Sequence, residues 1–172
     1  MILPIKKYPD PVLRKKCQEV EEVTPEIKKL GLNMIETMVT NQGIGLAAPQ
    51  VNVLKRIIVV HPISERTPGE MLAKKPQVFI NLKITKKSRE TMVDEEGCLS
   101  FPGLFLKIKR AKEVEIETLD GNGKKTFLKL EGLPARVFQH EIDHLDGILF
   151  IDRLSFWQRL KLRGKLKEYG SR

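Results

Sequence analysis

The residues best suited to chemistry in this chain are the run His-Glu-Ile-Asp-His at 140–144. On a helix, two imidazoles at this spacing differ by only about 40° in direction, so one metal ion can accept both. Glu141 lies about 100° from His140 on the same helical wheel, close enough to flank a metal without binding it, as a general base should. The spacing therefore predicts a metal site with an acid–base carboxylate. Two ordinary histidines on a solvated helix face are the alternative.

A third ligand must come from elsewhere, because catalytic metal sites usually combine three protein ligands with one open position. The best candidate is Cys98, in the segment Glu-Glu-Gly-Cys-Leu-Ser at 95–100, where a glycine lets the backbone approach closely. Cys17 has no neighbouring chemistry and suits a small buried apolar side chain. We therefore predict one divalent metal ion on Cys98, His140 and His144. A thiolate with two imidazoles suits Zn(II), Co(II), Ni(II) and Fe(II) alike.

Another notable segment is Gly-Ile-Gly-Leu-Ala-Ala-Pro-Gln, from Gly43 to Gln50. Its flexible glycines and small side chains would let the backbone lie against a substrate, and it ends in a primary amide. Taken alone, however, the segment favours a tightly packed helix C-terminus and turn.

The composition places bounds on the class of protein. With 172 residues, 41% of them apolar, the chain predicts one globular domain over 1–172. No segment has the features of a signal peptide or the length of a membrane span, so we expect a cytoplasmic protein without membrane contact. Two cysteines are too few for a disulfide framework. The 31 Lys and Arg against 22 Asp and Glu suit attraction to a polyanion such as RNA, or equally a chain from a warm habitat.

Three helices are predicted, at about 25–43, 134–146 and 155–167. Thr24 is a suitable N-cap for the first helix, with Pro25 at its first position. β-Branched or alternating patterns predict strands at 53–60, 78–84, 114–118 and 126–130, the last two joined as a hairpin by Asp-Gly-Asn-Gly. The polar segment 62–77 predicts a surface loop. Strands grouped without regular β-α-β alternation favour an α+β fold.

Together the three chemical segments resemble the signature motifs of the peptide deformylases, GxGLAAPQ, EGCLS and QHExDH. The motifs are complete here as Gly43 to Gln50, Glu96 to Ser100 and Gln139 to His144, and the likeness extends from about residue 4 through Asp152. The resemblance implies an α+β fold with antiparallel or mixed sheets packed around a central HExxH helix. It also implies Fe(II) in the cell and hydrolysis of the N-formyl group from N-formylmethionyl nascent peptides, with release of formate.

Site roles follow from the resemblance, residue by residue. It makes Cys98, His140 and His144 the metal ligands and Glu141 the acid–base group. It makes Gln50 and the Leu99 amide the donors to the developing oxyanion, a role that suits N–H groups physically. The implied substrate-binding residues are Gly43, Ile44, Gly45, Val137, Phe101 and Gly103, with the methionine side chain against Ile44 and Val137.

Some residues are implied to support this site, and others depart from the family. Glu96 and Arg110 occupy family positions that brace the metal loop, since a buried carboxylate needs a partner; two unpaired surface charges are the alternative. Asp143 and Asp146 are candidates to orient a ligand imidazole. His61 lacks ligand spacing and suits a structural role. Two positions depart from the family pattern: Phe105 stands where some relatives carry a basic residue that touches the peptide, and Leu82 replaces a frequent proline.

The basic C-terminal segment, 155–172, has two interpretations. In deformylases of similar design a C-terminal helix docks on the ribosome near the tunnel exit. The alternative is a solvated amphipathic helix whose Phe156, Trp157, Leu160 and Leu166 cover the core.

Two other functions remain open for the chain as a whole. One is an HExxH peptidase, although its third ligand usually lies downstream and no histidine follows His144. The other is a structural Cys-His-His metal site in an RNA-binding module, although structural zinc sites generally have four ligands.

Overall fold

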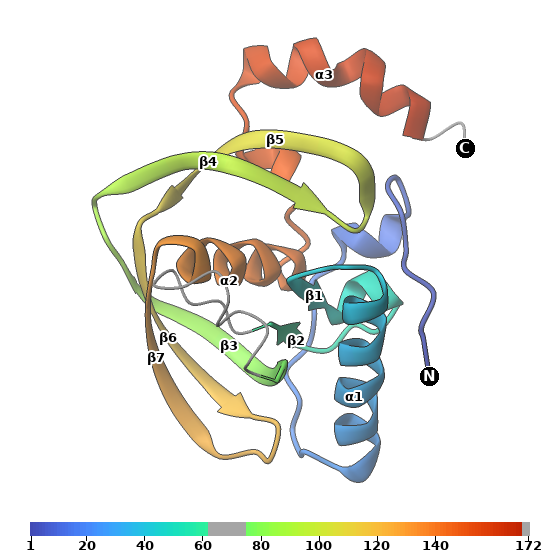
Figure 1. The fold of residues 1–172 in the computed structure, drawn as a ribbon, viewed down its shortest axis with the longest axis vertical. Coiled ribbons are helices and arrows are strands. Elements are labelled where there is room, and N and C mark those ends of the chain that lie inside the picture. Colours follow the sequence, from blue (N-terminus) through green and yellow to red (C-terminus); the bar gives the residue numbers. More distant parts are fainter. Residues whose placement is uncertain (62–74, 170–172) are drawn as a thin grey trace.

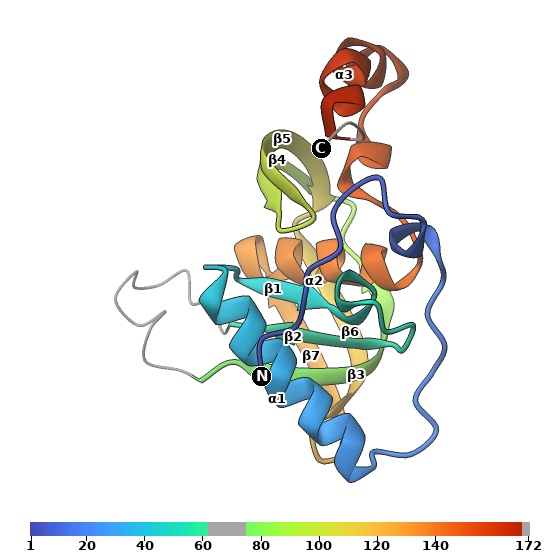
Figure 2. The same ribbon diagram turned by 90° about the vertical axis from the view of Figure 1, so that its right-hand side faces the viewer.

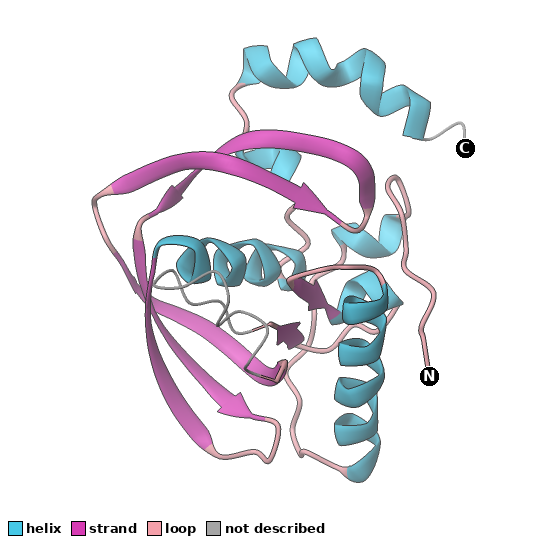
Figure 3. Ribbon diagram, in the orientation of Figure 1, coloured by secondary structure: helices cyan, strands magenta, loops and turns pink. Residues whose placement is uncertain are grey.

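The computed structural model describes residues 1–61 and 75–169, and its helices and strands are shown in Figures 1 and 3. In chain order they are α1 (Pro25–Thr40), β1 (Gly45–Ala47), β2 (Ile57–Val60), β3 (Gln77–Lys87), β4 (Thr91–Cys98), β5 (Phe101–Ala111), β6 (Glu113–Asp120), β7 (Lys125–Glu131), α2 (Gly132–Leu145) and α3 (Phe156–Tyr169). The fold is α+β, as predicted. Most of the loop predicted at 62–77 lies outside the described residues.

The strands form two antiparallel sheets with α2 between them. Five strands pair in the order β1-β2-β3-β6-β7, whereas β4 and β5 form a separate two-stranded sheet. Figures 1 and 2 both place α2 between the β4–β5 hairpin and the five-stranded sheet. The motif helix is therefore enclosed on both sides, as the predicted architecture requires.

The β2 strand explains how α1 and α2 come to lie on opposite faces of the large sheet. All four of its residues, Ile57 to Val60, are buried. Ile58 and Val60 share a hydrophobic cluster with α2, whereas Ile57 and Val59 share one with α1. Because successive strand residues point to opposite faces, an unbroken apolar run indicates a strand covered on both sides.

The first helix begins where predicted, with Thr24 accepting a hydrogen bond from the Ile27 amide, but it ends at Thr40 rather than near Gly43. Gln42 has a φ of 56°, and the Gly43 amide donates to the Met38 carbonyl. The chain thus leaves the helix through a left-handed residue before the glycine-rich segment.

The sequence patterns did not predict the β4–β5 hairpin, although Cys98 lies in it. Of the eight residues in β4 only Glu96 is buried, so this strand has no apolar face to mark it. The predicted strand at 53–60 begins only at Ile57, because the Val53 amide instead closes a turn onto the Ala48 carbonyl.

The α3 helix lies beyond the β4–β5 hairpin, away from the large sheet (Figure 1). Leu162, Leu166 and Tyr169 pack against the cluster around Phe101, and the Tyr169 hydroxyl donates to the Pro102 carbonyl at 2.8 Å. The expectation that Phe156, Trp157 and Leu160 cover the core is wrong, because these side chains are exposed. Among the described helices, none is both long and apolar enough to cross a membrane.

The position of α2 against β5 depends on Gln139. Its side-chain oxygen accepts from the Ala111 amide at 3.2 Å, and its side-chain nitrogen donates to the Ala111 carbonyl at 2.9 Å. The side chain is buried, so water cannot replace these bonds. Gln139, which directly precedes His140, therefore fixes how closely α2 approaches β5 and how the helix is rotated about its own axis.

We predict that Gln139→Leu lowers the free energy of unfolding by roughly 2 to 4 kcal/mol, because it leaves two buried backbone groups without their side-chain partner. Urea denaturation of mutant and parent would measure the difference. A change within about 0.5 kcal/mol, as is usual for surface substitutions, would contradict this account of Gln139.

Candidate active site

The three predicted ligands meet where α2 passes the end of β4. One ligand atom from each of Cys98, His140 and His144 lies within 4.8 Å of the others. Cys98 Sγ is 3.3 Å from His144 Nε2, and the two imidazole centroids are 5.0 Å apart. A soft thiolate with two imidazoles suits a transition metal such as zinc or iron, so these residues fit the predicted ion.

Glu96 orients the first imidazole. Its Oε2 lies 2.9 Å from His140 Nδ1 in a buried contact, which leaves Nε2 of that ring for a metal. Metal-binding histidines characteristically hold their second nitrogen in such a bond. His144 Nδ1 is buried without a hydrogen-bond partner among the described residues, so the structure assigns no orienting group to the second ring.

The surroundings shift the pKa values of the two imidazoles in opposite directions. Burial lowers the pKa of His140, but hydrogen bonds with Cys98 and Glu96 outweigh burial and raise it well above its usual value. Burial and the nearby charge of His140 hold the pKa of His144 well below its usual value. A metal ion binds only the deprotonated ligand nitrogen, so metal binding and protonation at this site compete.

Glu141 lies beside the ligands in a buried position, and burial raises the pKa of its carboxyl to about 7. Its Oε2 has no hydrogen-bond partner within the described part of the chain. A carboxylate with a pKa near neutrality can both accept and return a proton. Gly45 is required at this point, because a Cβ there would overlap the Glu141 carboxylate.

Gln50 points its amide nitrogen towards the site. The side-chain oxygen accepts from the Ala47 amide at 2.8 Å, which leaves the nitrogen to face Cys98 Sγ at 3.6 Å and Ser100 Oγ at 3.1 Å. Leu99 follows Cys98 directly at the turn between β4 and β5. Both predicted donors therefore lie beside Cys98.

A groove of about 530 Å³ runs along these groups. Its lining includes most of the predicted residues: Gly43, Ile44, Gly45, Gln50, Cys98, Leu99, Phe101, Gly103, His140 and Glu141. Phe101 is fully buried and stacks on Tyr8, so it is a rigid part of the wall. Gly103 has a φ of 74°, which favours glycine. Phe105 is exposed at the rim, with its ring against Gly97.

A smaller pocket of about 90 Å³ adjoins the ligands and contains the remaining predicted residue, Val137. Ile44 and Leu133 lie with it, so much of the lining is apolar. His140 and Glu141 also border this pocket, which places it directly beside the candidate chemistry.

Glu96 and Arg110 are in contact rather than unpaired at the surface. Arg110 Nε and Nη2 donate to the Glu96 carboxylate at 2.9 and 3.0 Å, with both side chains buried. Burial alone would raise the pKa of Glu96, but hydrogen bonds from His140 and Arg110 lower it well below its usual value. The carboxylate therefore stays charged.

The suggestion that Asp143 or Asp146 orients a ligand imidazole is wrong. Asp143 bonds Arg110 and Arg153 instead, and Asp146 bonds Arg56. Neither aspartate contacts a ligand imidazole, because arginines from neighbouring elements take up both carboxylates. Leu82 is buried among apolar residues that pack on α2, which fits a local structural role.

Sequence reasoning missed Arg136, which is 2% exposed and donates to Glu96 Oε1 at 2.7 Å. A signal was available, because Arg136 precedes His140 by one helical repeat of four residues and so shares its face. Its buried position could not be foreseen without the hairpin that covers it.

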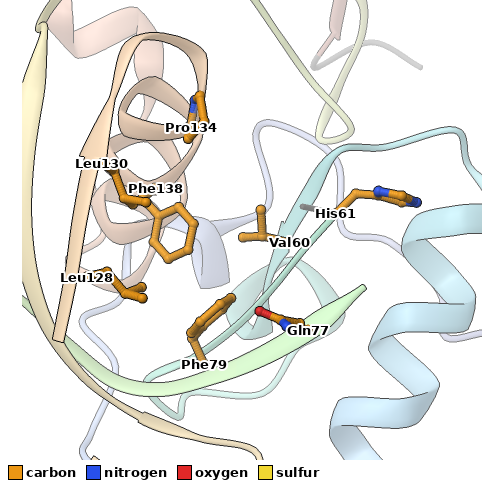
Figure 4. A pocket seen from close by; sticks show the side chains of 8 residues that line it. All are labelled: Val60, His61, Gln77, Phe79, Leu128, Leu130, Pro134 and Phe138. Carbon is orange, nitrogen blue, oxygen red and sulfur yellow. The ribbon is translucent and has the colours of Figure 1, made fainter. Parts of the chain in front are cut away.

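Another pocket, of about 180 Å³, lies on the face of α2 that turns towards the large sheet (Figure 4). It is lined by Val60, His61, Gln77, Phe79, Leu128, Leu130, Pro134 and Phe138. None of the predicted catalytic or ligand residues contributes to this lining. His61 lies at this pocket and outside the ligand cluster, as its lack of ligand spacing suggested.

Comparisons with known proteins give a consistent result. The family model described as polypeptide deformylase matches residues 2–160. A peptide deformylase of Thermodesulfovibrio yellowstonii is 51% identical over 96% of this chain and 97% of its own. The crystal structure of peptide deformylase from Ehrlichia chaffeensis, 42% identical, covers 98% of this chain and 96% of its own with a TM-score of 0.85. That from Thermotoga maritima, 41% identical, covers 90% and 99% with a TM-score of 0.82.

The sequence match, the shared fold and the cluster of Cys98, His140 and His144 all agree. This chain belongs to the polypeptide deformylase family of metal-dependent hydrolases.

Proposed function

We propose that this site removes the formyl group from N-formylmethionyl peptides of newly synthesised proteins by hydrolysis, releasing formate. The observation that carries the assignment is the meeting of Cys98, His140 and His144 beside a buried Glu141. Residues 1–172 would act as one catalytic domain in the cytoplasm, where nascent chains emerge. Formate release from formyl-Met-Ala-Ser by metal-loaded protein tests the activity, with acetyl-Met-Ala-Ser as the comparison substrate.

Cys98, His140 and His144 would hold the metal, which when bound supplies a Lewis acid that lowers the pKa of water. Glu141 accepts a proton from the attacking water and later delivers it to the departing amine. Two properties of Glu141 support this role: its Oε2 has no hydrogen-bond partner among the described residues, and its pKa is raised. The C–N bond of the formamide breaks, the oxygen of water remains in formate, and the peptide gains a free amino terminus.

Gln50 and the Leu99 amide would stabilise the negative charge on the formyl oxygen. The Gln50 side-chain oxygen accepts a hydrogen bond from the Ala47 amide, and this bond fixes the orientation of the side-chain nitrogen before substrate binds. Such preorganised donors typically contribute about 3 to 4 kcal/mol to transition-state stabilisation. The groove with Gly43, Gly45, Phe101 and Gly103 would hold the peptide backbone.

The small apolar pocket with Ile44 and Val137 would take the methionine side chain. A largely apolar lining suits a thioether, and the position of the pocket beside His140 and Glu141 suits the first residue of the peptide. The alternative peptidase reaction receives less support. In the described residues, the ligand cluster takes its third donor from the upstream Cys98.

The metal in the cell would be Fe(II), as the family resemblance implies, with Zn(II), Ni(II) or Co(II) able to occupy the same ligands in purified protein.

The basic α3 helix would dock on the ribosome near the tunnel exit. Its side chains Arg159, Lys161, Arg163, Lys165 and Lys167 are exposed. Phe156 and Trp157, 65% and 70% exposed, add aromatic surface next to these charges. Leu162, Leu166 and Tyr169 pack against the core cluster, while the basic side chains remain at the exposed surface, where a polyanion can reach them.

We predict that Glu141→Ala retains the metal but loses at least about 100-fold in kcat, because it removes the proton carrier and leaves three ligands in place. Metal content and formate release should be measured on the same preparation. Glu131→Ala, at an exposed carboxylate next to α2, should leave both unchanged. Substantial turnover by metal-replete Glu141→Ala would rule out the assigned role.

Cys98→Ser should weaken metal binding or change its preference, because a neutral hydroxyl replaces a thiolate on a borderline-soft ion. Competition with a chelator would measure the affinity. Cys17→Ser is the matched control, since Cys17 is buried apart from the ligands. Equal affinities in Cys98→Ser and parent would exclude Cys98 as a ligand.

Air should inactivate the iron-loaded protein faster than the nickel- or cobalt-loaded protein, because an open ferrous thiolate site is accessible to oxygen chemistry. Residual activity after timed exposure, with an anaerobic sample beside it, gives the comparison. If the iron and nickel forms lose activity in air at the same rate, either Cys98 does not bind the metal as a thiolate or oxygen does not reach the metal.

Reversing the charges of Arg159, Arg163 and Lys167 to Glu should abolish co-sedimentation with ribosomes at low salt while turnover of formyl-Met-Ala-Ser continues. Binding by the parent should weaken steeply with added salt, because contacts to phosphates release counterions. Reversal of Lys28, Lys29 and Lys87, three exposed lysines elsewhere, controls for net charge. Unchanged co-sedimentation of the α3 variant would remove the docking role.

A further inference from the structure

The side-chain amide of Gln50 is held at both of its ends. Its Oε1 accepts a hydrogen bond from the Ala47 amide at 2.8 Å, and its Nε2 donates to Ser100 Oγ at 3.1 Å. Only the oxygen can accept from an N–H, so the Ala47 bond decides which end of the amide faces the site. Gln50 is 2% exposed and lines the groove together with Cys98.

The bond to Ser100 sets the direction of the second N–H of this amide. A primary amide nitrogen carries two hydrogens in one plane, so engaging the first determines where the second points. A bond at the oxygen alone would leave that direction less defined, because the terminal torsion of glutamine has broad minima. Nε2 also lies 3.6 Å from Cys98 Sγ in hydrogen-bonding geometry, so an N–H is directed at the ligand cluster.

The backbones of Gln50 and Ser100 are held by one N-terminal segment, residues 6–8. The Lys6 amide donates to the Gln50 carbonyl at 2.7 Å, and the Tyr8 amide donates to the Ser100 carbonyl at 2.9 Å. The Tyr8 ring also stacks on the fully buried Phe101, next to Ser100 in the chain. The fold therefore sets the distance between the Gln50 amide and the Ser100 hydroxyl, although the two residues lie far apart in the sequence.

Ser100 has no direct access to a substrate. It is 0% exposed, and it is not among the described residues that line the groove. An effect of its hydroxyl on the chemistry therefore has to pass through a neighbouring group. The Gln50 amide is a group that this hydroxyl binds and that does line the groove.

We infer that Ser100 is a positioning residue, whose hydroxyl holds the Gln50 amide so that its second N–H faces the formyl oxygen in the transition state. The inference rests on the proposed function, which makes Gln50 a donor to that oxygen. A donor already aimed at the developing charge stabilises it without reorganisation, whereas a donor free to rotate has to be oriented during the reaction.

Ser100→Ala should lower kcat by roughly three- to tenfold, the effect of one net neutral hydrogen bond. KM for formyl-Met-Ala-Ser should change little, because the interaction is made mainly in the transition state. Gln50→Ala should lose about 100-fold or more in kcat, as removal of an oxyanion donor typically does. Metal content is measured on every variant, so that kcat refers to metal-loaded protein.

The decisive measurement is Ser100→Ala in the Gln50→Ala background. With the positioned amide already absent, loss of the Ser100 hydroxyl should change kcat by less than about twofold, since residues that act through one group are not additive. The same fractional loss in both backgrounds would overturn the inference, because it would mean that Ser100 acts on the protein as a whole. A partly unfolded Ser100→Ala would also reduce activity in both backgrounds, so it cannot imitate the expected result.

Thr118→Val is the matched control. This residue also has a buried hydroxyl, which donates to the Ile80 carbonyl at 2.9 Å, but it lies on β6 in the large sheet. The substitution should lower stability and leave kcat of the metal-loaded protein unchanged. A loss of kcat as large as that of Ser100→Ala would overturn the inference, because removal of a distant buried hydroxyl would then have the same effect.

Failure of the proposed function can be recognised separately. If Gln50→Ala keeps the kcat of the parent, Gln50 is not an oxyanion donor, and the inference about Ser100 falls with that assignment. If Gln50→Ala loses activity as expected while Ser100→Ala keeps the kcat of the parent, only the inference about Ser100 is overturned.

Discussion

The carboxylate of Glu96 joins the parts of this protein that must meet for a metal site to exist. It accepts hydrogen bonds from Arg110 on β5 and from Arg136 on α2, and it contacts His140 Nδ1 at 2.9 Å. All four side chains are buried. Removing Glu96 would leave the buried guanidinium of Arg136 without its carboxylate partner, and breaking a buried ion pair in this way commonly costs about 3 to 5 kcal/mol. The arrangement therefore strongly favours one packing of hairpin against helix.

The same strand that brings Glu96 to the arginines brings Cys98 to the histidines. Glu96 and Cys98 flank Gly97 on β4, and side chains two residues apart share a face of a strand. Gly97 itself leaves room for the Phe105 ring, since a Cβ there would lie 2.7 Å from Phe105 Cε1. The contact of Glu96 with α2 therefore also brings Cys98 close to the histidines, with Sγ 3.3 Å from His144 Nε2, even though the strand register shifts between Gly97 and Cys98.

Almost the whole surface of α2 is buried, and its different faces contact different parts of the protein. One face presents Arg136, His140 and His144 to the hairpin, while Phe138 and Ile142 pack on the large sheet. Gln139 and Asp143 are bonded to neighbouring elements between these faces. A helix packed in this way cannot rotate without breaking several buried polar contacts, so its ligands are held in place before metal or substrate arrives.

The sequence by itself determined the features that depend on local geometry or on motif spacing. His140 and His144 share a face because a helix repeats every 3.6 residues, whatever surrounds it. Cys98 was predicted because two histidine ligands call for a third donor, whereas the role of Gln50 came only from the family resemblance. Neither prediction includes any geometric information, because Cys98 lies 42 residues before His140 in the sequence. The α+β class likewise followed from the order of periodic segments.

Only the tertiary structure decided which distant groups touch. In the β4–β5 hairpin, β4 has no apolar alternation to reveal it, although Leu106 and Ile108 alternate with lysines in β5. The partners of Arg136, Asp143 and Asp146 depend on where that hairpin and the arginines lie. Whether Phe156 and Trp157 face the core or solvent depends on how α3 attaches through Leu162, Leu166 and Tyr169. Such contacts arise from the packing of whole elements, and a buried charge finds its partner only when those elements have met.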